Sequence, residues 1–406
     1  MDLILRNALI HDGERVDIGI DAGKVLAIGA ALEATGPQID LQQRLLLPGF
    51  VETHLHLDKS CILDRCHIEQ GTLMEAIAEV SRLKQGFSAD DVFERASRTL
   101  EKAIVQGTTH VRTHVEVDPV IGLRGFDGIK RVAAGYRWAV DVEICVFPQE
   151  GLTNNPGTEE LMREALADGA AVVGAVPYTD TDPHGQIDRV FRMARDFDVD
   201  VDMHLDLGDS AEDMDVEYVC QMTERHRYGG RVAIGHVTKM SLLAPERFEA
   251  MAKRLADVGV AVTVLPSTDL FLMGRQQRHS VLRGVVAAHE LLHHGVNCSL
   301  STNNVMNPFT PFGDCSLLRM ANLYANVCQV GTRDGMRACL EMVSSRSAKL
   351  LRLENYGIEV GKAADLVVLD CLSPEQGVAE LSAPLFGFKK GRRTFTRAPA
   401  ELHRPH

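Results

Sequence analysis

The chain has little of what marks a membrane, secreted or nucleic-acid-binding protein. It has no apolar run of about 18 residues that could cross a bilayer, and its N-terminus does not read as a secretion signal. Aromatic residues make up only 5% of the 406 positions and the net charge is −13, so a basic surface with stacking aromatics is not expected. The short basic run at 389–393 is expected to form a solvated turn. These absences predict a cytoplasmic protein that contacts neither membrane nor nucleic acid.

The cysteines also lack the order of a disulfide framework or a zinc knuckle. Nine are scattered along the chain, and no C-x-x-C occurs. Several stand inside apolar runs, as Cys145 and Cys298 do. They are expected to be buried free thiols in a reducing compartment.

What the chain does contain is a regular alternation of strand-like and amphipathic, helix-like segments. The strand-like segments are 50–57, 109–117, 142–149, 170–178, 199–206, 231–239, 260–267 and 296–304, and the helix-like ones include 90–107, 158–169, 186–200, 245–259 and 281–295. Eight such units predict an α/β fold, a (β/α)8 TIM barrel over 49–351. A doubly wound sheet is the alternative, but no glycine-rich phosphate turn follows the first strand.

The two chain ends share a different sequence pattern. Residues 1–48 and 352–400 read as short strands separated by turns, with no low-complexity linker between them and the centre. We expect them to pair with each other in a small β-sandwich domain formed by both chain ends.

Histidines stand at the ends of several barrel strands. His54 and His56 lie two residues apart, so they point to the same face of a strand. His204 and His236 end later strands in the same way. Because the C-terminal ends of barrel strands converge on one pocket, these imidazoles are expected to meet there, and imidazole is a common metal ligand.

Long collinear segments carry a family resemblance: LLPGFVETHLHLDKS at 46–60, GTTHVRTHVEVD at 107–118, VFPQEGL at 146–152, GHVTKM at 235–240 and NYGIEVGKAADLVVLD at 355–370. The chain resembles the amidohydrolase superfamily, most of all its cytosine deaminase branch, which includes aminohydrolases of s-triazines such as N-isopropylammelide. The resemblance implies one divalent metal ion, zinc or iron, held by His54, His56 and His204. It also implies that His236 acts on water or polarises the substrate, and that Gln149 binds the edge of a flat heterocycle.

The chain departs from that family where acids are expected. Leu207 replaces the glutamate of the strand-5 motif, and Asn303 replaces the strand-8 aspartate that binds metal and takes a proton. Such general acid–base groups typically contribute about 10²–10⁴-fold to rate. His236 and Asp206 are the candidates to replace them, with Asn303 beside the metal.

Three further residues are expected to line the substrate pocket. Asn304 stands where acids often occur in the family, and Phe309 takes the place of a common tryptophan. Lys59 follows the H-x-H and either contacts the substrate or pairs with Asp58 or Asp64.

The sequence therefore predicts a metal-dependent hydrolase for a C–N bond of a small nitrogen heterocycle, a pyrimidine, an s-triazine or a cyclic amide, in a possible homo-oligomer. Two alternatives stay open. One is a catalytically altered barrel that binds a small ligand, motivated by the two missing acids. The other is a non-hydrolytic metal-dependent reaction in the same pocket.

Overall fold

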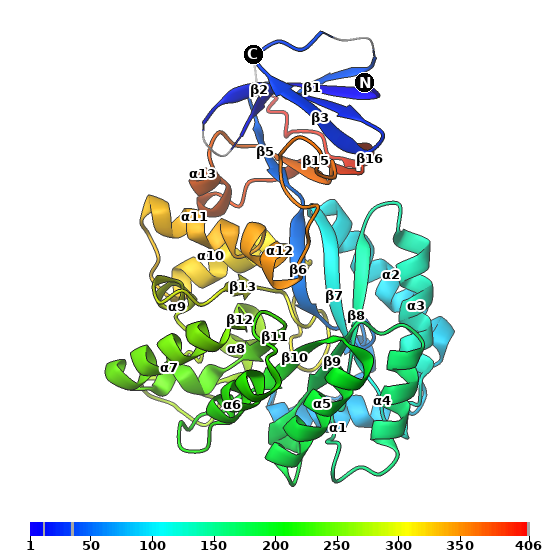
Figure 1. The fold of residues 1–406 in the computed structure, drawn as a ribbon, viewed down its shortest axis with the longest axis vertical. Coiled ribbons are helices and arrows are strands. Elements are labelled where there is room, and N and C mark those ends of the chain that lie inside the picture. Colours follow the sequence, from blue (N-terminus) through cyan, green and yellow to red (C-terminus); the bar gives the residue numbers. More distant parts are fainter. Residues whose placement is uncertain (11–12, 34–35, 404–406) are drawn as a thin grey trace.

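The computed structural model describes residues 1–10, 13–33 and 36–403, and its centre is a parallel barrel (Figure 1). Its strands are β6 (Phe50–Leu55), β7 (Thr108–Glu116), β8 (Asp141–Phe147), β9 (Val172–Ala175), β10 (Asp200–Leu205), β11 (Val232–His236), β12 (Val260–Val264) and β13 (Cys298–Leu300). They are hydrogen-bonded in sequence order from β6 to β13. Most positions in these strands are buried, as expected for a sheet covered by helices.

The barrel closes where the segment after β13 meets β6. Asn303 donates its backbone N–H to the carbonyl of His54 at 3.0 Å, and its own carbonyl accepts from the N–H of His56 at 2.9 Å. Deeper in the barrel, Thr53 donates its backbone N–H to Ser301 Oγ at 3.0 Å. The predicted TIM barrel is confirmed, and its seam runs through the H-x-H segment.

Helices surround the barrel strands (Figure 1). They are α1 (Leu73–Lys84), α2 (Ala89–Val105), α3 (Arg124–Tyr136), α4 (Thr158–Ala167), α5 (Pro183–Phe197), α6 (Val216–His226), α7 (Pro245–Val258), α8 (Pro266–Leu272), α9 (Ala288–His293), α10 (Leu317–Val327), α11 (Arg333–Glu341) and α12 (Ser345–Leu350). Helix α2 illustrates how the sequence forms and packs these helices. Ser88 caps it by accepting from the N–H of Asp91, and Val92, Ala96 and Leu100 form the face that is buried. Among the helices of the described ranges, none is long and apolar enough to span a bilayer.

One predicted helix is shorter than expected. The amphipathic pattern at 281–295 predicts a helix throughout, but α9 begins only at Ala288. Gly284 adopts a φ of +66°, a left-handed conformation that a right-handed helix cannot contain. The apolar pattern there reflects burial of Val285 and Val286 in a non-helical segment.

Both chain ends form a second sheet above the barrel in Figure 1. Its strands are β1 (Leu3–Leu9), β2 (Arg15–Asp21), β3 (Lys24–Gly29), β4 (Gln38–Asp40), β5 (Leu45–Pro48), β14 (Leu366–Leu369), β15 (Pro384–Lys389) and β16 (Arg392–Thr396). They run β16-β15-β14-β5-β1-β2-β3, with β4 beside β1, and enclose a separate core that includes Leu5, Leu46 and Phe388. The predicted pairing of the two chain ends is confirmed, and all their strands belong to one hydrogen-bonded mixed sheet.

A single residue, Gly49, separates β5 of the small domain from β6 of the barrel. A Cβ atom at this position would lie 2.2 Å from the side chain of Thr109, far inside van der Waals contact. Glycine therefore lets β6 approach β7 closely at the point where the chain enters the barrel. The H-x-H strand is thus a direct continuation of the small domain.

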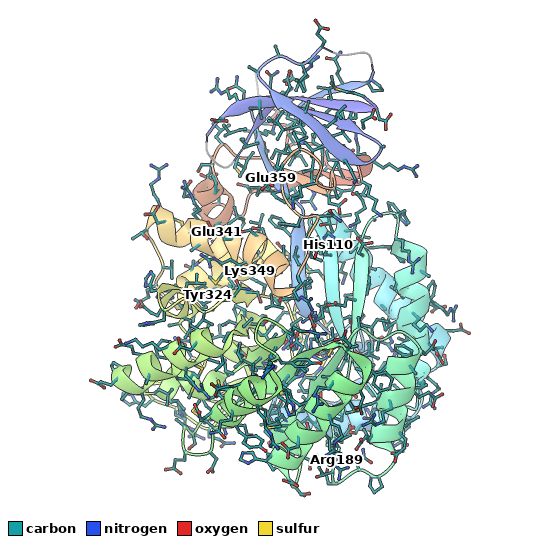
Figure 2. All side chains as sticks on the ribbon, in the orientation of Figure 1. His110, Arg189, Tyr324, Glu341, Lys349 and Glu359 are labelled. Atoms are coloured by element: carbon teal, nitrogen blue, oxygen red, sulfur yellow. The ribbon has the colours of Figure 1, made fainter. Side chains whose placement is uncertain are left out.

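A buried lysine, Lys389, joins the two domains. The expected solvated turn at 389–393 is wrong for this residue, whereas Lys390, Arg392 and Arg393 are exposed around a turn at 390–391. Lys389 is buried, and its Nζ donates to the carboxylates of Asp365 and Asp141, both at 2.7 Å, and to the carbonyl of Thr109 at 3.1 Å. Its Nζ also lies 3.4 Å from His110 Nε2, near the junction of the domains in Figure 2. Lys389, the last residue of β15, points toward the barrel strands β7 and β8, whereas Lys390 in the following turn is exposed.

We predict that Lys389→Met lowers the free energy of unfolding by about 3–5 kcal/mol, because it leaves Asp365 buried without its ammonium partner. Urea denaturation of the purified variant measures this change. The exposed neighbour supplies the control: Lys390→Met is expected to change stability by no more than about 0.5 kcal/mol. Equal effects of the two substitutions would contradict the assignment.

Candidate active site

Three imidazoles meet at the C-terminal end of the barrel strands. His204 Nε2, at the end of β10, lies 3.0 Å from His54 Nε2 and 3.0 Å from His56 Nε2. All three side chains are buried. Gly235, the register partner of His204 on β11, leaves room for this cluster, since an added Cβ would lie 3.1 Å from the His54 ring.

The cluster fits a divalent metal ion. Bonds of about 2.0–2.1 Å in a tetrahedral site place two ligand nitrogens about 3.3 Å apart, close to the separations here. Burial lowers the pKa of His54 to about 3 and holds those of His56 and His204 well below the ordinary value, so the rings are neutral and their lone pairs are free to coordinate. A fourth imidazole, His114, stacks on His54 at 3.7 Å between centroids and shares a group with His54 and His204 whose nitrogens lie within 4.8 Å of one another.

A carboxylate that the sequence analysis did not single out lies beside these rings. Asp202 Oδ1 is 3.7 Å from His54 Nδ1 and 3.4 Å from His114 Nε2, and its Oδ2 accepts from Arg112 at 3.0 Å. Burial opposes its charge, but His114, His54 and Arg112 outweigh burial and hold the pKa of Asp202 well below its usual range. The sequence could have predicted the place of Asp202, because it precedes His204 by two residues on the same strand and so lies on the same face.

His236 is oriented by Asp269, which lies in α8 just after β12. His236 Nδ1 lies 2.6 Å from Asp269 Oδ1, and Asp269 Oδ2 accepts from the N–H of Leu265 at 3.1 Å. Since a carboxylate accepts, Nδ1 carries the proton and Nε2 keeps a lone pair in the neutral ring. Burial raises the pKa of Asp269 from its ordinary value.

Lys59 is buried and directed toward the predicted substrate residues. Its Nζ donates to Glu116 Oε1 at 2.6 Å and to Gln149 Oε1 at 2.9 Å, and lies 4.7 Å from the centre of the Phe309 ring. The partner of its charge is therefore Glu116, at the end of β7. Asp58, which the sequence suggested, instead accepts the backbone N–H of Lys59 at 2.9 Å.

The asparagines after β13 take different places. Asn304 Oδ1 accepts from Asn307 Nδ2 at 2.7 Å, which ties this segment together. Asn303 has a φ of +60°, and both polar atoms of its buried side chain have no hydrogen-bond partner within the described residues. An unsatisfied buried amide is costly, so Asn303 has the capacity to bind a further group.

Asp206 is held by the backbone of the next helix. Its two carboxylate oxygens accept from the N–H groups of Asp215, at 2.9 Å, and Val216, at 3.1 Å, where α6 begins. Burial raises its pKa to about 6. These contacts favour a structural role, and the catalytic role expected from sequence stays a prediction.

Most of the predicted site residues line one small cavity. Its wall combines histidines and polar groups with the apolar side chains of Leu73, Leu207 and Leu272, and it includes His56, Lys59, Gln149, Tyr178, His204, His236, Thr268, Asn304 and Phe309. The volume is about 10 Å³, close to the smallest that holds one water molecule. A ring-sized ligand therefore requires the lining to move, and Leu207 contributes only hydrocarbon to this lining.

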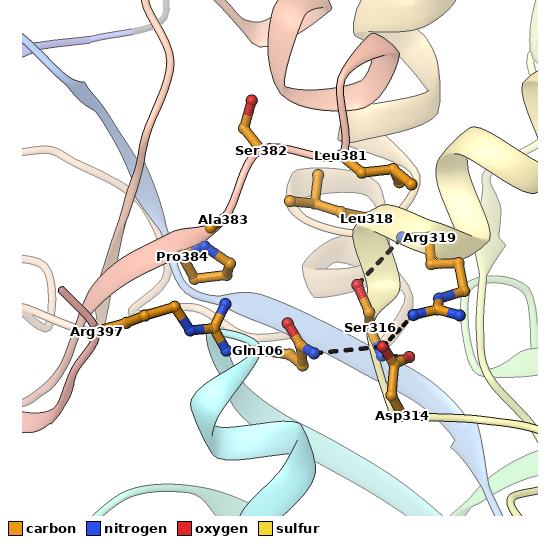
Figure 3. A pocket seen from close by; sticks show the side chains of 10 residues that line it. All are labelled: Gln106, Asp314, Ser316, Leu318, Arg319, Leu381, Ser382, Ala383, Pro384 and Arg397. Atoms are coloured by element: carbon orange, nitrogen blue, oxygen red, sulfur yellow. Dashed lines mark hydrogen bonds and ion pairs between the residues drawn. The ribbon is translucent and has the colours of Figure 1, made fainter. Parts of the chain in front are cut away.

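A larger hollow of about 180 Å³ lies elsewhere, where α2 and α10 meet β15 (Figure 3). Asp314 pairs there with Arg319 and lies 3.5 Å from the Gln106 amide nitrogen. The hollow contains neither histidine nor cysteine, and its acid is already paired. The histidine cavity is therefore the better candidate for catalysis despite its size.

Residues 45–395 match the model of the amidohydrolase family, so the chain belongs to this family of hydrolases. It is similar to the N-isopropylammelide isopropyl amidohydrolase of Pseudomonas sp. (strain ADP), with 28% identity over 403 residues and 96% of each chain covered. Among solved structures, it is similar to 5-methylcytosine deaminase from Klebsiella pneumoniae liganded with 5-fluorocytosine, with a TM-score of 0.95, 27% identity and 99% of each chain covered. It is also similar to N-isopropylammelide isopropylaminohydrolase from Burkholderia multivorans, with a TM-score of 0.86, 26% identity and 97% and 98% of the chains covered.

A buried charge cluster connects the cavity to the surface. Behind Lys59, Glu116 lies 3.3 Å from Lys84 Nζ, and Lys84 also pairs with Asp118 and Glu150. Glu150 is partly exposed. Burial and the neighbouring Glu116 raise the pKa of Glu150 from 4.5 to about 7, since three carboxylates share this lysine.

We predict that Glu150→Gln makes stability less dependent on pH between about pH 4.5 and about pH 7. In this window the folded state binds the Glu150 proton more tightly than the unfolded state, so wild-type stability falls as pH rises, by at most about 1.4 kcal/mol per unit. The glutamine variant loses this decline. Urea midpoints at several pH values measure it.

The exposed Glu160→Gln serves as the matched control and is expected to follow the wild-type pH profile. A Glu150→Gln profile parallel to wild type would contradict the raised pKa of Glu150.

Proposed function

We propose that the protein is a metal-dependent amidohydrolase that hydrolyses a C–N bond of a small nitrogen heterocycle, a pyrimidine, an s-triazine or a cyclic amide. The supporting observation is the convergence of His54, His56 and His204 beside a cavity that also contains His236 and Gln149. The similar proteins named for N-isopropylammelide and 5-methylcytosine support a ring substrate.

One divalent ion, zinc or iron, is held in this proposal by His54, His56 and His204. When bound, such an ion supplies Lewis acidity that lowers the pKa of water and polarises the bond to be broken. The three neutral imidazoles determine where this ion would be held, beside the cavity that His56 and His204 line. Asn303, which closes the barrel seam, contributes its unpartnered amide beside them.

His236 is the proton acceptor in this scheme. Asp269 accepts the Nδ1 proton at 2.6 Å, which leaves the lone pair of Nε2 available to the attacking water. The proton then passes to the leaving nitrogen, which departs as an amine or ammonia. Asp206 stays a second candidate for this transfer, although its carboxylate accepts from the start of α6.

The substrate ring is held by the opposite wall. Gln149 and Asn304 supply polar groups, Lys59 supplies charge, and Phe309 supplies a flat apolar surface against which a ring can pack. Leu207 and Leu73 keep the remaining edge apolar and exclude water. A cytoplasmic location and a homo-oligomeric assembly stay predictions from the sequence.

The function is tested on metal-analysed protein with a panel of cytosine, isocytosine, ammelide-type triazines and cyclic ureas. We expect one metal ion per chain, release of ammonia or amine from at least one compound, and incorporation of oxygen from labelled water into the product. Removal of the metal by a chelator is expected to abolish turnover, and the metal to restore it.

His204→Asn is the matched inactive variant and is expected to lose bound metal, whereas the exposed His279→Asn should retain metal and turnover. Bound metal with ring binding but no turnover would overturn hydrolysis in favour of a binding protein. Product formed without oxygen from water would instead favour a non-hydrolytic reaction.

We further predict that Asp269→Asn lowers kcat/KM by about 10²–10⁴-fold, because an amide cannot hold the Nδ1 proton of His236 as a carboxylate does. Metal content should stay at the wild-type level, since Asp269 touches none of the three proposed ligands. Asp257→Asn, an exposed substitution on α7, is the control. Loss of metal together with activity would show that Asp269 acts through the metal site rather than through His236.

A further inference from the structure

The free polar groups of the Gln149 side chain are fixed by its neighbour. The Lys59 ammonium has only donors, so the atom of Gln149 that faces it at 2.9 Å must be the amide oxygen. The Nε2 group, with its two N–H donors, is therefore directed elsewhere. Across the described residues, Nε2 has no hydrogen-bond partner, and Gln149 lines the cavity. Gln149 thus offers donors to a ligand.

Asn304 is oriented in the same sense through Asn307. The Oδ1 atom of Asn307 accepts the backbone N–H groups of Phe309, at 3.0 Å, and Thr310, at 3.2 Å, which identifies it as the oxygen. Its Nδ2 then donates to Asn304 Oδ1 at 2.7 Å. The oxygen of Asn304 is occupied, so its Nδ2 donors remain for the cavity that it lines.

Lys59 adds a cationic donor to these two amides. Its ammonium carries three N–H bonds, of which Glu116 and Gln149 take two. No carboxylate lines the cavity among the described residues, and the acid of the family motif is replaced by Leu207. Glu116 pairs with Lys59 and is not one of the residues that line the cavity. This wall therefore presents N–H donors, and the charge of the donor on Lys59 is paired with Glu116 at 2.6 Å.

Resting on the proposed function of this same cavity, we propose that the site takes its ring as an acceptor-rich anion: an oxygen-substituted heterocycle with an acidic ring N–H, bound in its deprotonated form. Ring oxygens and the deprotonated nitrogen accept from Lys59, Gln149 and Asn304. A neutral ring would direct an N–H against one of these donors and leave both groups unsatisfied in a buried site, which is costly.

The experiment compares two rings of nearly equal shape, uracil and 6-azauracil, on the metal-loaded protein. 6-Azauracil loses its ring proton near neutral pH, whereas uracil stays neutral there. Dissociation constants are measured by calorimetric titration from about pH 6 to about pH 8, and the ligands are recovered and checked for integrity. The ratio of the two constants cancels any titration of the protein itself.

We expect the preference for 6-azauracil over uracil to increase with pH, by up to about tenfold per unit, and to level off once the ring is ionised. In Lys59→Met this increase should fall several-fold, whereas in the Lys253→Met control, on the exposed face of α7, it should persist. A flat or decreasing ratio in the wild type, or no measurable binding of either ring, would overturn the proposal, even if Lys59→Met fails to fold.

The outcome is separable from that of the proposed function. Neither probe carries an exocyclic amine, so its affinity is measured without turnover. A rising ratio with no hydrolysis of any amino ring would contradict the proposed function alone. Turnover together with a flat ratio would contradict the anionic ring alone.

Discussion

The site depends on bringing three uncharged imidazole nitrogens to one point inside a closed barrel. Burial removes water from His54, His56 and His204 and keeps them neutral, so three lone pairs face one another with separations of 3.0 Å. Such an arrangement is unfavourable unless a cation fills it. The barrel imposes it through strand register, through the seam at Asn303, and through Gly235, which spares the space beside His54.

Around the three imidazoles, carboxylates lie on one side and hydrogen-bond donors on the other. Asp202 holds negative charge next to the imidazoles, and Asp269 orients His236 from behind. The opposite wall lacks acids and turns its amide donors inward, because Lys59 and Asn307 occupy the oxygens of its two amides. In the proposed scheme His236 therefore carries the proton transfer, and the donors of this wall decide which ligand the cavity favours.

Much of this was accessible from sequence. Alternating periodicities predicted the barrel, and the i, i+2 spacing of His54 and His56 predicted a shared face. What escaped prediction depends on contacts between distant segments. The pairing of Asp269 with His236 is recognisable only once β11 and α8 lie together. The burial of Lys389 depends on its contacts with Asp365 and with Asp141 at the start of β8. The segment before α9 also escaped prediction, because Gly284 has a positive φ and hydrophobic periodicity alone does not distinguish a helix from a buried loop.

The small domain has a consequence for how the chain is made. Strand β5 pairs with β14, so the sheet begun by the first 48 residues is completed only by segments after residue 365. During synthesis the early strands leave the ribosome with an unpaired edge, and the whole barrel follows before their partner arrives. Non-local pairing of this kind is slow and exposes strands to association. The small domain thus depends on segments after residue 365 to complete its sheet.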